Sequence, residues 1–220
     1  MVLNMGRFSE QLALDAALNL DASVEHCPGW NVRDLVVHIG DVQRFWVHIA
    51  SERLTSRPTN FERGLPSDAL PVVWFRSQTS ALVSALDSCA DDVALWTWWE
   101  PAQNAAWVKR RQLNEVVVHA WDAANAVGIA RPIPTDVAIV GLGEFVDVFA
   151  RDLREGAEPP PVALVATDCD WSAILFSDDP TVVPGLELRG TASELLLSLW
   201  SRAPVADPGV TAALGAIDLS

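Results

Sequence analysis

The chain has 220 residues, half of them hydrophobic, so it can form one large domain or two modest ones around a substantial core. Its 29 acidic and 15 basic residues give a formal net charge of −14. A field of this sign repels nucleic-acid phosphates and anionic lipid head groups. We therefore expect neither nucleic acid nor a membrane surface as a partner.

Targeting signals and cysteine use indicate the compartment. The start of the chain lacks the continuous apolar core of a secretory signal, and no later run approaches the ~20 apolar residues that a spanning helix needs. The cysteines, Cys27, Cys89 and Cys169, are odd in number and widely spaced, which favours neither a disulfide framework nor a four-cysteine zinc site. The sequence predicts a cytoplasmic protein with reduced cysteines.

Helical periodicity dominates the first part of the chain. It predicts helices over 8–20, 31–52, 70–90, 103–127 and 136–155. Asn31 is a suitable N-cap for the second helix, with Asp34 three residues later to favour its positive end. Gly128 follows the fourth helix, where glycine readily takes the left-handed conformation that ends helices. These residues are expected to form a helical bundle.

The sequence pattern changes from helical to strand-like at the three prolines of 159–161. Short segments rich in residues suited to strands, with turn residues between them, predict strands over 162–168, 171–176 and 181–190. A helix over 191–202 follows, with Thr191 and Glu194 at capping-box spacing, and the last 18 residues read as a loosely specified tail. The predicted fold is mainly α, with a helical bundle over 1–157 and a small α+β domain over 158–220.

The segment NEVVVHAWD, residues 114–122, places Glu115 and His119 four positions apart among apolar neighbours. On a helix these side chains start about 6 Å apart, whereas on a strand they would be ~13 Å apart. The helix is favoured because apolar residues form one stripe along it: Leu113, Val116, Val117, Ala120, Ala124 and Val127. A neighbouring stripe is polar and contains Arg111, Glu115, His119 and Asp122.

This polar stripe has two interpretations. It is either a solvated face on which Arg111 and Glu115 form an ordinary ion pair, or part of a site in the bundle core. His38 lies on or beside the apolar face of the second predicted helix, so a carboxylate and two imidazoles can converge there. Such a set suits Zn²⁺ and leaves a fourth coordination position open. The pattern alone leaves both interpretations open.

Three motifs, taken in order, resemble the mycothiol-dependent maleylpyruvate isomerase family. They are CPGW before the helix that carries His38, NEVVVHAWDAANAVG followed by RPIP, and LELRGTASELLLSLWSR. The resemblance covers nearly the whole chain. It implies an N-terminal DinB-like four-helix metal-binding bundle and a small C-terminal α+β domain of sterol-carrier-like type. It also implies that His38, Glu115 and His119 are the metal ligands, with Zn²⁺ as the expected ion.

The resemblance further implies an enzyme that uses the small thiol mycothiol as cosubstrate. Its thiolate would add to an electrophilic, possibly anionic substrate, either in cis–trans isomerisation of the maleylpyruvate type or in S-transfer. The alternative is a non-catalytic binding or regulatory module with the same pocket. We expect a monomer or a homodimer that binds small molecules.

Further candidates surround the predicted metal site. Arg111 and Arg189 are candidates to bind an anionic substrate, although an exposed residue or a structural ion pair explains either equally well. Trp98, between Trp96 and Trp99, is a candidate wall of a ligand cleft. Asp122 is a candidate to orient a metal ligand. His26, Cys27 and His48 are not expected to bind the metal.

Overall fold

The computed structural model describes residues 1–61, 63–179 and 181–219, and it divides into two compact units, Met1–Arg131 and Pro132–Ser220. The fold is mainly helical with one small sheet, as predicted. The division falls earlier than the predicted boundary at 157. Helix α5 (Thr135–Asp147) packs on α6 (Ala192–Leu199), so it belongs to the second unit and not to the bundle.

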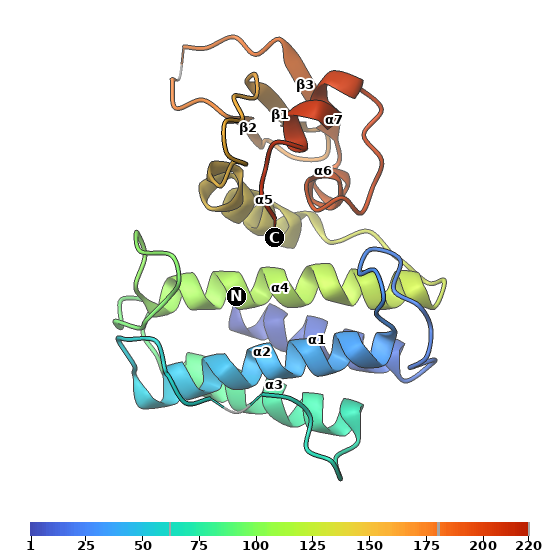
Figure 1. Ribbon diagram of the computed structural model, residues 1–220, viewed down its shortest axis with the longest axis vertical. Coiled ribbons are helices and arrows are strands. Elements are labelled where there is room, and N and C mark those ends of the chain that lie inside the picture. Colours follow the sequence, from blue (N-terminus) through green and yellow to red (C-terminus); the bar gives the residue numbers. More distant parts are fainter. Residues whose placement is uncertain (62, 180, 220) are drawn as a thin grey trace. The chain divides into compact units, whose positions relative to one another are not determined.

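The first unit is a four-helix bundle (Figure 1). Its helices are α1 (Val2–Ala16), α2 (Val32–Glu52), α3 (Pro71–Asp87) and α4 (Ala105–Ala126). Helix α1 packs chiefly against α4 and α3, and α2 packs against the same two helices. Large apolar side chains from all four helices are completely buried between them, among them Leu12, Ile39, Leu82 and Leu113.

The observed ends of helices α2 and α4 agree with the local signals in the sequence, whereas those of α1 do not. Asn31 is the N-cap of α2, as predicted, and it forms a capping box with Asp34; Gly128 has a φ of 76° just after α4. Helix α1 differs from the prediction of 8–20, because it begins at Val2 and ends at Ala16. Met5 and Leu12 are buried on one face, so the packing of α1 begins before residue 8.

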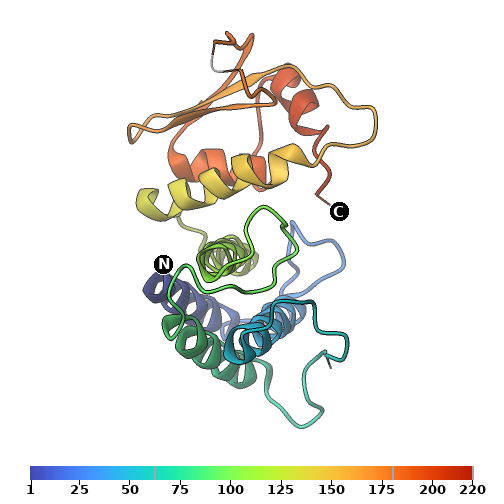
Figure 2. The same ribbon diagram turned by 90° about the vertical axis from the view of Figure 1, so that its left-hand side faces the viewer.

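The second unit is a three-stranded sheet covered by helices. Its strands are β1 (Val162–Ala166), β2 (Ser172–Leu175) and β3 (Leu186–Gly190), in the order β2-β1-β3. Strand β1 is antiparallel to β2 and parallel to β3. Helices α5 and α6 lie on one face of the sheet, where alternate residues of β1 are buried (Figure 2). Thr191 and Glu194 form the predicted capping box of α6.

Two predictions for the second unit are wrong, and one interaction explains both. Helix α5 ends at Asp147, not near 155, and is followed by the short 3-10 helix η1 (Phe149–Arg151). The chain then pairs with the C-terminal segment, since the amide of Arg154 donates to Ala216 and that of Asp218 to Asp152. The predicted loose tail instead contains helix α7 (Pro208–Leu214), whose N-cap is Asp207; Ser220 lies outside the described residues.

Helices α2 and α3 approach closely at Gly40, two residues after His38. A Cβ added at Gly40 would lie 2.2 Å from Cζ3 of Trp74 on α3, and the Trp74 side chain is itself buried. Gly40→Ala is therefore expected to destabilise the protein by about 1–3 kcal/mol through overpacking. Urea unfolding of the full chain, followed by circular dichroism, measures this loss.

Gly143 in α5 is the matched control, since a Cβ there would meet no heavy atom within 4 Å outside its own helix. Alanine has the higher helix propensity, so Gly143→Ala should stabilise the protein by up to about 1 kcal/mol. A Gly40→Ala protein as stable as the wild type would contradict the close packing of α2 on α3.

Candidate metal centre

The polar stripe of α4 is not a solvated face. The side chains of Arg111, Glu115 and His119 are 8%, 19% and 14% exposed, and that of Asp122 is completely buried. A face in contact with water would leave such long side chains largely exposed. The interpretation as an ordinary surface ion pair is therefore wrong, and the stripe has to satisfy its charges within the protein.

His38 comes from α2 to meet this stripe. Its Nε2 lies 3.4 Å from Oε1 of Glu115, and Nε2 of His119 lies 3.7 Å from the same oxygen. The two imidazole rings are edge to face with their centroids 5.7 Å apart. The ring of Trp30, in the turn before α2, lies 4.9 Å from that of His38. His38 and the distant pair Glu115 and His119 thus present their nitrogen and oxygen atoms to one point.

The register between α2 and α4 produces this meeting. His38 lies beside Glu115 and His119, whereas Trp46, two turns further along α2, lies beside Trp107, which precedes them in α4. The two helices therefore run in opposite directions. Each side chain of the cluster projects from the middle of a capped helix that is packed on two others, so its position is well defined.

The spacing of the donor atoms fits a divalent cation. One ligand atom each from His38, Glu115 and His119 can be chosen so that all lie within 4.8 Å of one another. A tetrahedral ion with bonds of about 2.0–2.2 Å separates its ligand atoms by roughly 3.4 Å. The observed 3.4 Å and 3.7 Å are close to this value. Small side-chain movements would complete the coordination.

Glu115 is held in its charged form. Burial alone would raise the pKa of Glu115. The positive charge of Arg111 and a hydrogen bond with His38 together lower this pKa by more than burial raises it. The net result is a pKa well below the usual 4.5. Arg111 lies one helical turn earlier, and its guanidinium donates to Oε2 of Glu115. The other oxygen, Oε1, faces the two histidines.

Asp122 sets the orientation of His119. Its Oδ2 lies 2.9 Å from Nδ1 of the imidazole. An ionised carboxylate only accepts hydrogen bonds, so it favours the tautomer with the proton on Nδ1, in which the lone pair of Nε2 can bind an ion on the side of Glu115 and His38. A carboxylate behind a histidine in this way is typical of metal sites.

Cys27 is a neighbour that the sequence did not reveal. Its Sγ lies 4.0 Å from Oδ2 of Asp122, on the Nδ1 side of His119. Ninety-five positions separate Cys27 from Asp122. No local pattern relates the CPGW turn to α4, because their proximity arises only when α2 packs on α4. The sequence does not predict Cys27 as a metal ligand, yet the structure places it beside the predicted metal ligands.

The other predicted site residues lie elsewhere or are already engaged. Arg111 binds Glu115, and His48 pairs with Glu52 at 3.2 Å. Trp98 is 46% exposed, and its ring lies edge to face on Trp107. Arg189 is on β3 of the second unit, where it is 55% exposed and donates to Glu187 at 2.8 Å. Roles for Arg111, Arg189 and Trp98 in binding substrate or cofactor remain predictions.

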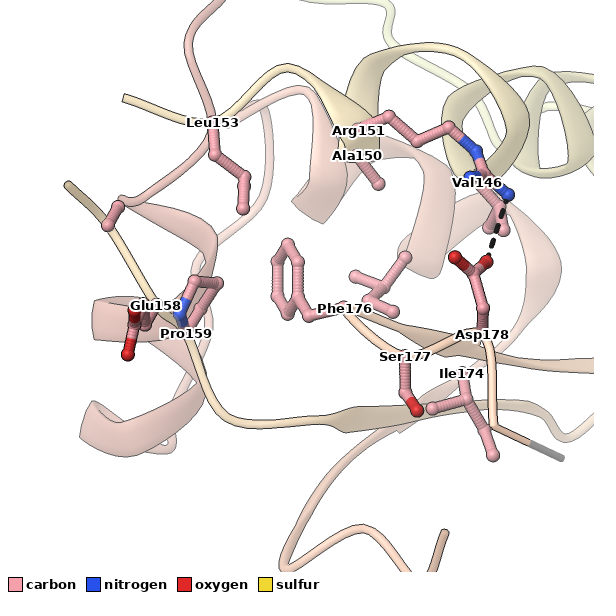
Figure 3. Close-up of a pocket in the computed structure, with 12 residues that line it drawn as sticks. Val146, Ala150, Arg151, Leu153, Glu158, Pro159, Ile174, Phe176, Ser177 and Asp178 are labelled. Atoms are coloured by element: carbon pink, nitrogen blue, oxygen red, sulfur yellow. Dashed lines mark hydrogen bonds and ion pairs between the residues drawn. The ribbon is translucent and has the colours of Figure 1, made fainter. Parts of the chain in front are cut away.

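The second unit contains a cavity of about 490 Å³ with a different lining (Figure 3). Apolar side chains such as Val146, Ile174 and Phe176 form its walls, and an ion pair joins Arg151 to Asp178 at 3.2 Å. The lining contains neither histidine nor cysteine. Among the described residues, the candidate metal ligands therefore belong to the first unit.

Comparison with known families gives a match within the first unit. Residues 5–124 match the family described as the mycothiol maleylpyruvate isomerase N-terminal domain. The chain belongs to this family. The matched segment contains His38, Glu115 and His119. No curated protein and no solved structure matches the chain significantly. None of the described helices is both long and apolar enough to span a membrane.

The Arg111–Glu115 pair can be tested by a double-mutant cycle on metal-free protein. Arg111→Met should cost about 3 kcal/mol or more, since it leaves a buried carboxylate without its counter-charge. Adding Glu115→Gln should recover much of that loss, which urea unfolding of the wild type and three variants will measure. Strictly additive losses would contradict a direct charge interaction.

The stability of the wild type relative to Glu115→Gln should also depend on pH. The folded-state pKa of Glu115 is lowered, so its ionised form contributes stability above the usual value of 4.5 and loses it as the pH falls toward the folded-state pKa. Metal-free wild type should therefore lose stability relative to Glu115→Gln when the pH is lowered below about 4.5. A difference that stays constant with pH would show that folding does not lower the pKa of Glu115.

Proposed function

We propose that this protein is a metal-dependent enzyme that activates mycothiol for addition to an electrophilic substrate. The reaction is cis–trans isomerisation of the maleylpyruvate type or thiol transfer. The observation that carries the proposal is the meeting of His38, Glu115 and His119 with spacings suited to one divalent cation. Membership of the mycothiol maleylpyruvate isomerase N-terminal domain family supports the choice of thiol.

The three side chains supply two neutral imidazole nitrogens and one carboxylate oxygen. This set suits Zn²⁺, and three protein ligands leave a position open for another molecule. When bound there, a divalent cation lowers the pKa of a thiol and keeps it as the nucleophilic thiolate near neutral pH. Arg111 holds Glu115 as a carboxylate, and Asp122 keeps the proton of His119 on Nδ1. Both residues thus prepare the donors before any ligand arrives.

The cluster is accessible from one side. His38 is 37% exposed, whereas Glu115 and His119 are about half as exposed or less, at 19% and 14%. A small molecule therefore approaches past His38 and the neighbouring ring of Trp30. The partly buried carboxylate beyond them lies in a region where water is limited, which strengthens its interaction with a cation. Arg111 and Arg189 are our candidates for an anionic group of the substrate.

Metal content gives the first test. Protein purified without chelator should carry a divalent ion, and His119→Ala should lose it, since two remaining ligands rarely hold a metal. His48→Ala is the matched control, because His48 lies on the same helix as His38 but pairs with Glu52. Elemental analysis measures the ion. Equal metal content in His119→Ala and His48→Ala would refute the ligand set.

Asp122→Asn tests the orientation of His119 while it retains all three donors. An amide can donate a hydrogen bond to Nδ1 and so favour the wrong tautomer. Metal affinity should fall by about 10–100-fold. Competition with a chromophoric chelator measures this affinity. An unchanged affinity would show that the hydrogen bond from His119 to Asp122 does not orient the ligand.

Turnover separates an enzyme from a binding module. Metal-loaded protein is incubated with mycothiol and a panel of cis-enoates and other electrophiles, with Glu115→Gln as the control. The proposal expects product from at least one member of the panel and none from the control. Tight binding without conversion across the whole panel would favour the non-catalytic module.

A further inference from the structure

The turn before α2 brings a thiol to the far side of His119. One ligand atom each from Cys27, His119 and Asp122 can be chosen so that all lie within 4.8 Å of one another. Oδ2 of Asp122 is the central atom, 2.9 Å from Nδ1 of His119 and 4.0 Å from Sγ of Cys27. We propose that these three residues form a second cation position, specific for thiophilic ions, which competes with the first position for His119.

The donor set defines the kind of ion. A thiolate, an imidazole and a carboxylate suit Zn²⁺ and softer ions such as Cd²⁺, whereas Mg²⁺ and Mn²⁺ prefer sites made of oxygen atoms. Ligand atoms around a tetrahedral ion are roughly 3.4 Å apart, so the observed 2.9 Å and 4.0 Å require only small adjustments. The carboxylate of Asp122 is completely buried between the two other groups, where a cation would offset the cost of burying it.

The same geometry argues against a thiol activated by histidine. In a cysteine–histidine pair the imidazole nitrogen faces the sulfur, so that it can take the thiol proton. Here the nearest partner of Nδ1 is the carboxylate oxygen of Asp122, and Nε2 faces Glu115. The carboxylate of Asp122, and not the thiol of Cys27, is therefore the hydrogen-bond partner of Nδ1. A cation that joins all three groups fits this arrangement better than a nucleophile and its base.

The two positions exclude each other because a neutral imidazole has a single lone pair. With an ion in the first position, Nε2 of His119 is the ligand and Nδ1–H donates to Asp122. With an ion in the second position, Nδ1 becomes the ligand and the proton moves to Nε2, where Glu115 can accept it. The thiol proton of Cys27 is released to solvent. Each ion thus selects one tautomer of His119.

This competition has a functional consequence. A thiophilic ion held by Cys27 withdraws His119 from His38 and Glu115, and the two ligands that remain rarely hold an ion. The first position is therefore emptied without any contact between the thiophilic ion and His38. The inference concerns only the metal chemistry of the chain, and it stands whether or not the protein acts on mycothiol.

Cadmium titration tests the second position. Apo-protein is titrated with Cd²⁺, and the ultraviolet charge-transfer absorption of cadmium–thiolate bonds is recorded as a difference spectrum for the wild type and single variants. Cys27→Ser should lose this absorption, while Glu115→Gln should keep it, because Glu115 belongs only to the first position. Cys169→Ser is the matched control, since Cys169 is partly exposed like Cys27 but lies in the second unit. Circular dichroism confirms that each variant is folded.

The outcomes separate this inference from the proposed function. Absorption that survives Cys27→Ser, or that is lost in Glu115→Gln, would overturn the second position. Equilibrium dialysis adds the test of exclusion, because the wild type should hold one Cd²⁺ per chain at saturation. Two ions bound at once would overturn the competition for His119. A chain that binds Cd²⁺ through Cys27 but shows no turnover would refute only the enzyme.

Discussion

The candidate metal site depends on one partly buried carboxylate. Glu115 projects between two imidazoles and remains charged because Arg111 lies one turn away on the same helix. A buried ion pair is weak evidence for stability, since hydrophobic residues of similar volume often stabilise a fold equally well. The polar stripe of α4 is better explained by a ligand. A cation beside Oε1 would neutralise the side of Glu115 that Arg111 does not reach.

The bundle is suited to hold such a group. Helices α2 and α4 run in opposite directions, and their register brings His38 level with Glu115 and His119. Gly40 allows α2 to lie close to α3 two residues after His38, so the helix that carries this histidine is fixed from both sides. Helices packed in this way position side chains more accurately than loops do. The hydrogen bond to Asp122 then favours one tautomer of His119.

The helix ends and the spacing of the site residues on α4 could be predicted from the sequence, because they follow from local chemistry. The caps at Asn31 and Thr191 and the helix stop at Gly128 follow from side-chain and backbone preferences that need no tertiary context. Helical spacing also placed Glu115 and His119 on one face. It did not show whether that face was buried, because a solvated stripe and a buried site have the same period. The resemblance to a known family, and not periodicity, favoured the metal site before the structure did.

The features that the sequence did not predict depend on contacts between residues distant in sequence. The boundary between the units was misplaced because the period of α5 does not reveal that its partner is α6. The segments after α5 and after α7 pair with each other at Leu153 and Ile217, which are far apart in sequence. Cys27 was missed for the same reason, since a turn and a distant helix share no local signal.

The central claim is that His38, Glu115 and His119 bind one cation together. Crystals of the zinc-loaded protein, with data collected at the zinc absorption edge, test it most directly. We expect an anomalous peak about 2.0–2.2 Å from Nε2 of both histidines and from a carboxylate oxygen of Glu115. Zinc found only at other residues, with these three side chains turned away from one another, would contradict it.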